Sequence, residues 1–205
     1  MPASVAEFFD SLAPVWDDRA DDDLTRVSQL FKRLDIQNGD KVLDLACGTG
    51  VVTGLIHRFS CTPVHGLDIS IEMIARAKAK YARDDYASFE QGDFLSWKGG
   101  RYDYIVIYNA YPHFVDVAAF KNALLEHLVP GGRFAIVHSI GRAKLAQHHH
   151  NLSANISRNI DAPKEEAVAY QDCFDIFLAE EGEDFYLLAG RLSNKEQNTV
   201  LPKNK

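Results

Sequence analysis

Residues 41–50, KVLDLACGTG, decide the fold that this sequence predicts. The first half of the stretch is an apolar run typical of a buried strand. The glycines that follow allow a sharp turn and a close approach of the backbone to a ligand. Residues 51–59 then continue with the spacing expected of a helix. A strand, a glycine turn and a helix in this order predict one unit of an α/β sheet.

The same alternation continues along the chain. Further strands are predicted at 62–68, 86–91, 102–108 and 133–138, with helices at 71–81 and at 116–128, the latter ending at Pro130-Gly131-Gly132. A final hairpin is predicted between 173–179 and 185–191. Strands that alternate with helices favour βαβ units and a mainly parallel sheet with helices on both faces.

Length and composition indicate one domain. The chain has 205 residues, 46% of them hydrophobic, and we expect a single domain over 1–192 followed by a polar tail at 193–205. Within the domain, 1–38 is predicted to form a helical lid or edge segment, and 140–171 a substrate-side insertion. The three cysteines form no CxxC pair and favour a reducing, cytoplasmic location. No apolar run is long enough to suggest a membrane span.

The charge balance argues against a nucleic-acid partner. The formal net charge is −7, and no basic stripe is visible that could neutralise phosphates. The run Asp21-Asp22-Asp23 is most simply a solvated helix start, and no metal is expected. We expect a small-molecule substrate, no membrane partner, and a monomer or homodimer.

The loop at 44–50 separates two kinds of nucleotide site. A dinucleotide fingerprint, G-x-G-x-x-G, would need a third glycine where this chain has Thr53. Asp44 precedes the loop, and a carboxylate repels a pyrophosphate but attracts a cation. S-adenosylmethionine has no phosphate and carries a sulfonium and an ammonium. Asp44 therefore favours S-adenosylmethionine over NAD.

Two further acids follow the next strands. Asp68 comes 24 residues after Asp44 (68 − 44) and can accept hydrogen bonds from both ribose hydroxyls. Asp93 can accept from the adenine amino group while Phe94 or Ile69 covers the ring. Either acid could instead be a helix cap or turn residue, but the set favours a nucleoside site.

Five segments together resemble the class I S-adenosylmethionine-dependent methyltransferases: VLDLACGTG, GLDIS with IEMIARAKAK, QGDFL, YDYIV and LVPGGRFAI. The resemblance spans about 41–138 and implies a Rossmann-like open sheet of seven strands with an antiparallel last strand. It also implies that Asp44, Gly48 and Gly50 hold the methionine end of the cofactor. The expected cofactor-binding residues are Asp44, Ala46, Gly48, Thr49, Gly50, Asp68, Ile69, Met73, Asp93, Phe94 and Tyr108.

Two histidines are candidate general bases, because a base is needed where the acceptor must lose a proton. His113-Phe114 is similar to the HHF stretch of the ubiquinone and menaquinone methyltransferases, with Pro112 in place of the first histidine. His138 ends a predicted strand and should border the same cavity, and the segment after it resembles small bacterial relatives. Either histidine could instead serve only the structure. Trp16, Tyr111, Arg142 and His150 are the expected substrate-binding residues.

The sequence therefore predicts methyl transfer from S-adenosylmethionine to a small-molecule acceptor, releasing S-adenosylhomocysteine. Two alternatives stay open at this point. One is a cofactor- or metal-binding module on the same fold without turnover. The other is an NAD-linked oxidoreductase, which Thr53 and Asp44 disfavour.

Overall fold

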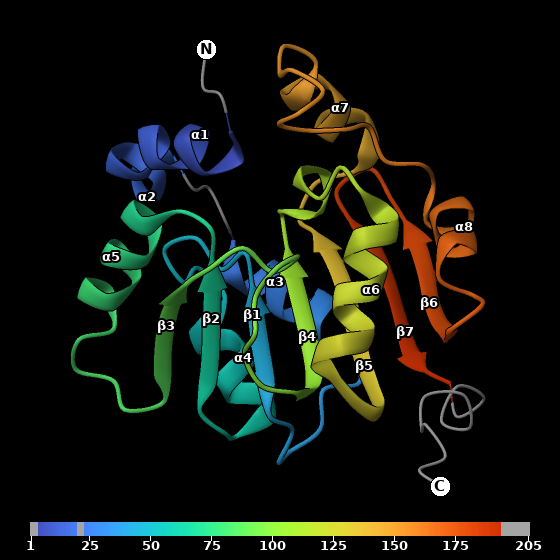
Figure 1. Cartoon of the computed structure of the whole chain (residues 1–205), viewed down its shortest axis with the longest axis horizontal. Helices are drawn as coiled ribbons and strands as arrows, with labels where there is room; N and C mark the ends of the chain where they lie inside the picture. Colours follow the sequence, from blue (N-terminus) through green and yellow to red (C-terminus); the bar gives the residue numbers. More distant parts are fainter. Residues whose placement is uncertain (1–3, 20–22, 194–205) are drawn as a thin grey trace, which may run out of the picture.

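The strands form one open sheet in the computed structural model, which describes residues 4–19 and 23–193. Its order is β3-β2-β1-β4-β5-β7-β6, with neighbours parallel except β7, which is antiparallel to β5 and β6 (Figure 1). The strands are β1 Val42–Leu45, β2 Val64–Asp68, β3 Ala87–Gln91, β4 Tyr102–Tyr108, β5 Leu128–His138, β6 Phe174–Glu181 and β7 Tyr186–Leu192. The predicted Rossmann-like sheet with an antiparallel last strand is confirmed. Residues 194–205, nearly all of the predicted polar tail, lie outside the described part.

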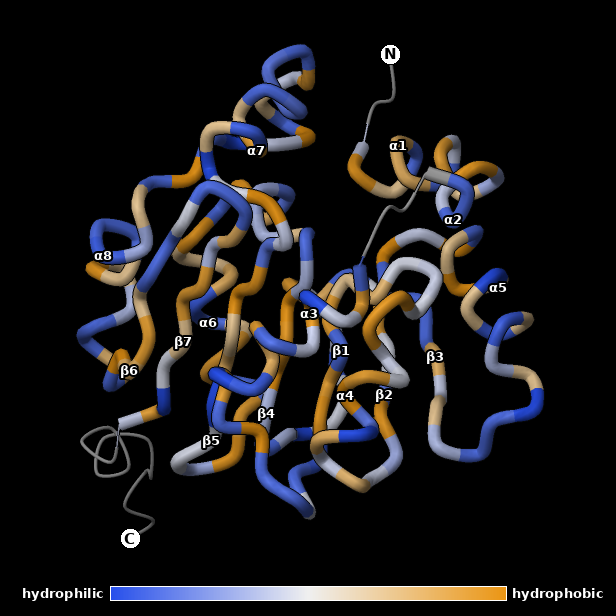
Figure 2. Tube along the Cα trace, turned by 180° about the vertical axis from the view of Figure 1, so that it is seen from behind, coloured by the Kyte–Doolittle hydropathy of each residue, from blue (hydrophilic) through white to orange (hydrophobic). Residues whose placement is uncertain are grey.

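Helices cover both faces of this sheet. The helices are α1 Val5–Leu12, α2 Trp16–Arg19, α3 Leu24–Phe31, α4 Thr53–Ser60, α5 Ile71–Lys80, α6 Val117–His127, α7 Arg142–His149 and α8 Pro163–Glu166, with 3-10 turns η1 Ala13–Val15, η2 Tyr111–His113 and η3 Ala167–Ala169. One core cluster joins α6 to one face, and a second joins α3 and α4 to the other. In Figure 2 the hydrophobic colours run along the central strands that these clusters bury.

The parallel strands bring their carboxyl ends to one edge, where α1, α2 and α7 lie (Figure 1). Short polar caps fix the helices that begin there. Ser70 accepts a hydrogen bond from the backbone N–H of Met73 at 3.1 Å, and Asp116 caps α6 in the same way through Ala119. Ligands of open α/β sheets bind at this edge, so it is where a site is expected.

Strand β5 differs from the prediction at its start. We expected Pro130-Gly131-Gly132 to end the preceding helix and the strand to begin at Arg133, but β5 begins at Leu128. Its pairing with β4 jumps from Tyr102↔Leu128 to Tyr104↔Arg133, so the proline and glycines lie in an irregularity of the ladder. Because the backbone is unpaired in this irregularity, the missing N–H of Pro130 breaks no ladder hydrogen bond. Gly131 can also adopt its left-handed φ of +72° there.

Both the backbone conformation and the close packing at residue 50 require glycine, and an alanine substitution tests this requirement. Its φ is +79°, and an added Cβ would come within 2.8 Å of the Tyr81 ring and 3.2 Å of Phe89. Gly50→Ala is expected to lose about 1–2 kcal/mol from the left-handed backbone and about 1–3 kcal/mol more from overpacking. Gly131→Ala is the matched control, because the φ of Gly131 is also positive but a Cβ added there would meet no neighbouring side chain or backbone within 4 Å. Denaturant unfolding of both variants measures the difference, and equal losses would contradict the packing argument.

Candidate active site

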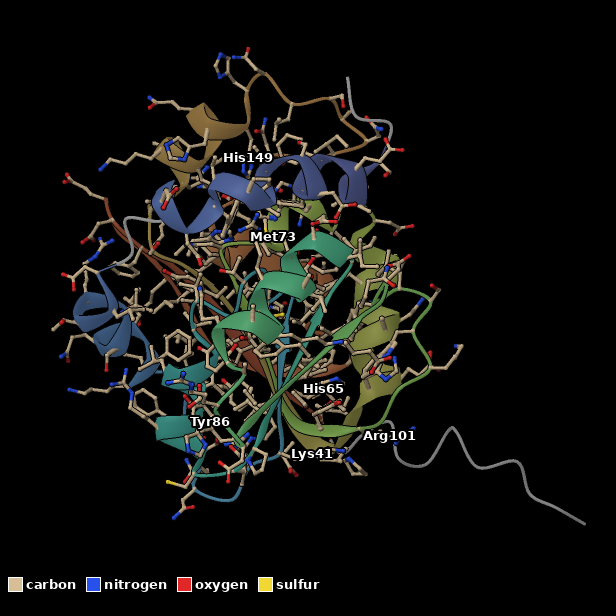
Figure 3. The ribbon with its side chains drawn as sticks, turned by 90° about the vertical axis from the view of Figure 1, so that its left-hand side faces the viewer. Lys41, His65, Met73, Tyr86, Arg101 and His149 are labelled. Carbon is tan, nitrogen blue, oxygen red and sulfur yellow. The ribbon has the colours of Figure 1, made fainter. Side chains whose placement is uncertain are left out.

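A cavity of about 430 Å³ opens at the carboxyl ends of β1, β2 and β4, beneath α1. Its walls come from segments far apart in the sequence: α1, the β1–α4 loop, the ends of β2 and β3, the turn after β4, and Asn155 of the segment after α7. Figure 3 labels Met73 on α5, just below α1, and this side chain lines the same cavity. The tertiary fold therefore gathers these segments around one cavity at the edge that binds ligands in such sheets.

Asp44 is the most unusual group of the cavity. Its side chain is 1% exposed, and Oδ2 accepts a hydrogen bond from the Thr53 hydroxyl at 2.6 Å. Oδ1 has no hydrogen-bond partner among the described residues. Burial raises the pKa of this carboxyl to about 7, and the nearby Asp68 adds to the rise. A buried carboxylate with one free oxygen is a site for a cationic donor such as an ammonium.

In the sequence, Thr53 mattered only because it is not the third glycine of a dinucleotide fingerprint. In the structure, its hydroxyl has a direct contact with Asp44. Because its hydroxyl bonds the Asp44 carboxylate, it favours the ionised form. Thr53→Val is expected to weaken S-adenosylmethionine binding by roughly tenfold or more near neutral pH, since a hydrogen bond to a charged group contributes about 1.5–3 kcal/mol. Thr53→Ser keeps the donor and is the control. Calorimetric dissociation constants test this, and equal affinities of the two variants would contradict it.

Asp68 is held rigidly beside the glycine loop. Oδ2 accepts from the backbone N–H of Gly48, and Oδ1 accepts from that of Ser70, each at 2.8 Å. Burial raises the pKa of the carboxyl to about 6, although these amide bonds oppose the rise. The side chain also lines the cavity. A carboxylate oxygen accepts more than one hydrogen bond, so Asp68 has capacity left for two ligand hydroxyls.

Beyond Asp68, the cavity wall has one acid, Asp93, and several apolar side chains. Asp93 is exposed, and its Oδ1 accepts from the Leu95 N–H at 3.0 Å. Phe94 and Met73 are buried and contribute apolar wall, while Ile69 and Tyr108 complete it. An acid beside apolar side chains suits a flat base with an exocyclic amino group.

The backbone is strained where β1 and β4 end. Ala46 and Asn109 both have φ of +53°, which residues other than glycine seldom adopt. Asn109 is held there because its side-chain amide donates to the Ser139 hydroxyl and accepts from the Ser139 N–H, both at 2.9 Å. Both strained residues line the cavity. Strain of this kind is kept where the surroundings fix it, often at functional sites.

Two predicted cofactor residues, Thr49 and Gly50, do not line the cavity. Thr49 donates to Asp17 Oδ1 at 2.5 Å and accepts from Lys80 Nζ at 3.0 Å. Asp17 also pairs with Lys80 at 2.8 Å. These contacts tie the segment 16–19 to the glycine loop and to α5. Gly50 packs against Tyr81, whose hydroxyl donates to its carbonyl at 2.7 Å.

The N-terminal segment lies over the cavity as a cover. Asp10 Oδ1 accepts from the Ser70 hydroxyl at 2.5 Å and from the Glu72 N–H at 3.2 Å, which joins α1 to α5. Phe9 and Trp16 line the cavity and meet edge to face at 5.7 Å between ring centroids. Phe9 was not among the predicted site residues, and no pattern in the sequence distinguishes it from its neighbour Phe8.

His113 lies at the cavity wall with a defined tautomer. Its Nδ1 is 2.8 Å from the carbonyl oxygen of Ile156, and because a carbonyl only accepts, Nδ1 donates. The neutral ring therefore has its lone pair on Nε2. Burial lowers the pKa of His113, so the ring stays neutral near pH 7. Phe9 packs on it edge to face at 4.8 Å.

We expected His138 to border the same cavity, and the structure corrects that placement. Its ring is fully buried, packs edge to face on Tyr186 at 5.8 Å, and does not line the cavity. Neither ring nitrogen has a hydrogen-bond partner within the described residues. Burial lowers the pKa of His138 to about 3, with further lowering by His149 and His113. The side chain points into the core because successive residues of a strand alternate faces.

Three of the four predicted substrate residues also lie elsewhere, and Trp16 alone of them lines the cavity. Tyr111 is buried, with its hydroxyl donating to Glu166 at 2.5 Å. Arg142 is exposed and pairs with Glu181 at 3.1 Å. His150 is exposed, with Nδ1 bonded to the Gln147 carbonyl at 2.7 Å. Contacts made in the folded chain, which the sequence does not reveal, remove these side chains from the cavity.

Neither a metal cluster nor a spanning helix is found in the part of the chain that the structure describes. Within 4–19 and 23–193, no three His, Cys, Asp or Glu side chains lie together so that they could hold a metal ion. None of the helices described there combines the length and the apolar character of a membrane span.

An α/β sheet of this order, with a cavity lined by three acids at its carboxyl edge, is the architecture of the class I S-adenosylmethionine-dependent methyltransferases. The chain belongs to the methyltransferase domain family, whose model matches residues 36–187. The predicted resemblance to that class is confirmed. The similarity to quinone methyltransferases stays a prediction.

Similar proteins include the sterol 24-C-methyltransferase of Saccharomyces cerevisiae, 30% identical over 63% of this chain and 36% of that protein. The trans-aconitate 2-methyltransferase of Pseudomonas paraeruginosa is 32% identical over 53% of this chain and 39% of that protein. The chain thus matches less than half the length of these two relatives. Among solved structures, the DhpI-SAH complex has a TM-score of 0.74 at 21% identity, covering 93% of this chain and 96% of that one.

Proposed function

We propose that this protein transfers a methyl group from S-adenosylmethionine to a small-molecule acceptor and releases S-adenosylhomocysteine. The observation that carries the proposal is Asp44, a buried carboxylate with a free oxygen in an acidic cavity. Such a group is unfavourable without a cation and favourable with one. A nicotinamide dinucleotide would bring a pyrophosphate to this carboxylate, so the oxidoreductase alternative finds no support.

The described residues fit the cofactor. Asp44 and Gly48 would hold the methionine end, Asp68 the ribose, and Asp93 with Phe94, Ile69 and Met73 the adenine. Ala46 and Tyr108 would complete the wall, whereas Thr49 and Gly50 would act by shaping the loop. Bound S-adenosylmethionine supplies a methyl group already activated by its sulfonium.

His113 is the proposed general base. It lines the cavity, its free lone pair is on Nε2, and its lowered pKa keeps that lone pair available near pH 7. Phe9 and Trp16, on the segment that covers the cavity, would exclude water from the reacting groups. His138 would act at most indirectly, since its ring is buried outside the cavity.

The acceptor is proposed to be a small molecule, because the cavity lies at the lower end of the roughly 300–1,000 Å³ typical of small-molecule sites. One relative is named for trans-aconitate, a tricarboxylate, but no Lys or Arg of the described residues lines this cavity. We also propose a cytoplasmic enzyme, because all three cysteines are free thiols. A monomer or homodimer stays a prediction from the sequence.

Calorimetry and isotope transfer together test the proposal. The protein should bind S-adenosylmethionine and S-adenosylhomocysteine but not NADH. Label from methyl-labelled S-adenosylmethionine should then move to a low-molecular-weight fraction of a metabolite extract, and not when Asp44→Asn replaces the native protein. Binding of NADH in preference would refute the cofactor assignment. Binding of S-adenosylmethionine with no transfer to any fraction would favour a binding module without turnover.

A further inference from the structure

The cavity has two halves of different character. The carboxylates of Asp44, Asp68 and Asp93 all belong to the half proposed for the cofactor. To the other half we assign the lining residues of α1, of the turn after β4 and of the segment after α7, which are Val5, Phe9, Asn109, Ala110, His113, Phe114, Val115 and Asn155. Aromatic and aliphatic side chains make up most of this second half, which we refer to as the acceptor half.

The polar groups of the acceptor half are few, and several already have partners. The side-chain amide of Asn109 is bonded on both sides to Ser139. Nδ1 of His113 is bonded to Ile156, which leaves Nε2 as the ring atom able to accept a proton. An acceptor placed there meets one basic nitrogen and a mainly apolar wall.

Cations are absent from this wall within residues 4–18 and 23–193, whose side chains the structure describes. The basic side chains nearby are paired elsewhere: Lys80 with Asp17, and Arg158 with Glu166. Lys41 and Arg101, labelled in Figure 3, lie at the far end of the sheet from α1. An anionic acceptor would therefore lose its hydration and find no counter-charge from the protein.

The cofactor does not reverse this balance. S-adenosylmethionine carries one net positive charge, whereas three carboxylates line its half of the cavity. A cationic acceptor is also disfavoured, because it would lie beside the sulfonium and the acceptor half has no carboxylate. An uncharged acceptor avoids both penalties, and flat rings suit the edge-to-face wall of Phe9 and His113, 4.8 Å apart.

We propose that the methyl acceptor is a compact, uncharged, phenol-type molecule whose hydroxyl is directed at Nε2 of His113. This inference rests on the proposed methyl transfer. The acceptor's O–H proton passes to Nε2 while its oxygen takes the methyl group. The electron pair of the broken carbon–sulfur bond stays on sulfur, so the products are an aryl methyl ether, S-adenosylhomocysteine and a protonated His113.

The test compares two ring compounds of similar size and different charge. The probes are 4-methylphenol and benzoate, titrated calorimetrically near neutral pH into protein loaded with sinefungin, whose amine keeps the cofactor's positive charge. We expect 4-methylphenol to bind and benzoate to bind at least roughly tenfold more weakly, a difference of about 1.4 kcal/mol. With S-adenosylmethionine, 4-methylphenol should yield its methyl ether.

A positive charge introduced at Val115 tests whether the probes bind in the acceptor half of the cavity. Val115 lines the cavity and is 42% exposed, so a longer side chain can be accommodated. Val115→Lys should strengthen benzoate binding by roughly tenfold, and Val115→Met, of similar length but uncharged, should not. Equal affinity of the native protein for both probes, binding of neither, or no effect of the added lysine would overturn the acceptor assignment. Failure of sinefungin itself to bind would instead refute the proposed function.

Discussion

Asp44→Asn is expected to abolish measurable binding of S-adenosylmethionine and, at the same time, to raise the thermal stability of the free protein. The first effect follows because the substitution removes the carboxylate proposed to pair with the cofactor's ammonium. Loss of one partner of a buried ion pair costs about 3–5 kcal/mol, which corresponds to a fall in affinity of more than roughly a hundredfold.

The second effect follows from the raised pKa. Burial raises the pKa of Asp44 from 3.8 to about 7, so the folded free protein holds this proton more tightly than the unfolded chain. This group's contribution to the free energy of unfolding is therefore greatest below pH 4 and is lost as the pH rises to about 7. Asparagine removes this penalty. We expect a gain of a few kcal/mol near pH 8, or several degrees in melting temperature, and a smaller gain near pH 5.

Asp93→Asn is the matched control, because Asp93 also lines the cavity but is exposed. It should change the melting temperature little at either pH. Native-protein affinity for S-adenosylmethionine should also weaken as the pH falls below about 7, by up to roughly tenfold per unit, because protonation of Asp44 competes with the cation. Unchanged binding by Asp44→Asn, or a lower melting temperature at both pH values, would contradict this account of the site.

His113→Gln is expected to lower methyl transfer by roughly 10²–10⁴-fold, the usual contribution of a positioned general base. Glutamine can still donate to the Ile156 carbonyl but has no lone pair of comparable basicity, so the fold and the cofactor affinity should be retained. Initial rates with the acceptor identified by isotope transfer, together with calorimetry of S-adenosylhomocysteine, separate the two effects.

The pH profile distinguishes a base from a residue that only shapes the wall. Because burial lowers the pKa of His113, the native rate at saturating S-adenosylmethionine should hold steady through neutral pH and fall only below the ordinary histidine range, as protonation removes the lone pair. The variant should lack this fall. His148→Gln on exposed α7 is the control and should leave the rate unchanged. A native rate that falls with pH while the variant shows the same profile would exclude His113 as the base.

The sequence alone determined the sheet and the position of the cofactor loop. Strand β4 is predicted with the bounds that the structure has, because a strand buried on both faces is a continuous apolar run. The glycine loop and the acids at the ends of β1 and β2 are local features, and a parallel sheet brings all strand ends to one edge. Short-range patterns and one rule of topology were therefore enough to place Asp44 and Asp68 at the cavity.

Only the tertiary structure decided the acceptor side. Whether His113 or His138 faces the cavity depends on which way one strand's side chains point and on what the turn after β4 packs against. Thr53 is part of the site because its hydroxyl bonds Asp44 across the loop, and Phe9 because the N-terminal segment packs it against His113. Tyr111 lies outside the cavity, where its hydroxyl bonds Glu166. Each outcome is set by packing between segments distant in sequence, where burial and hydrogen-bond partners decide a side chain's direction and leave no periodic trace in the chain.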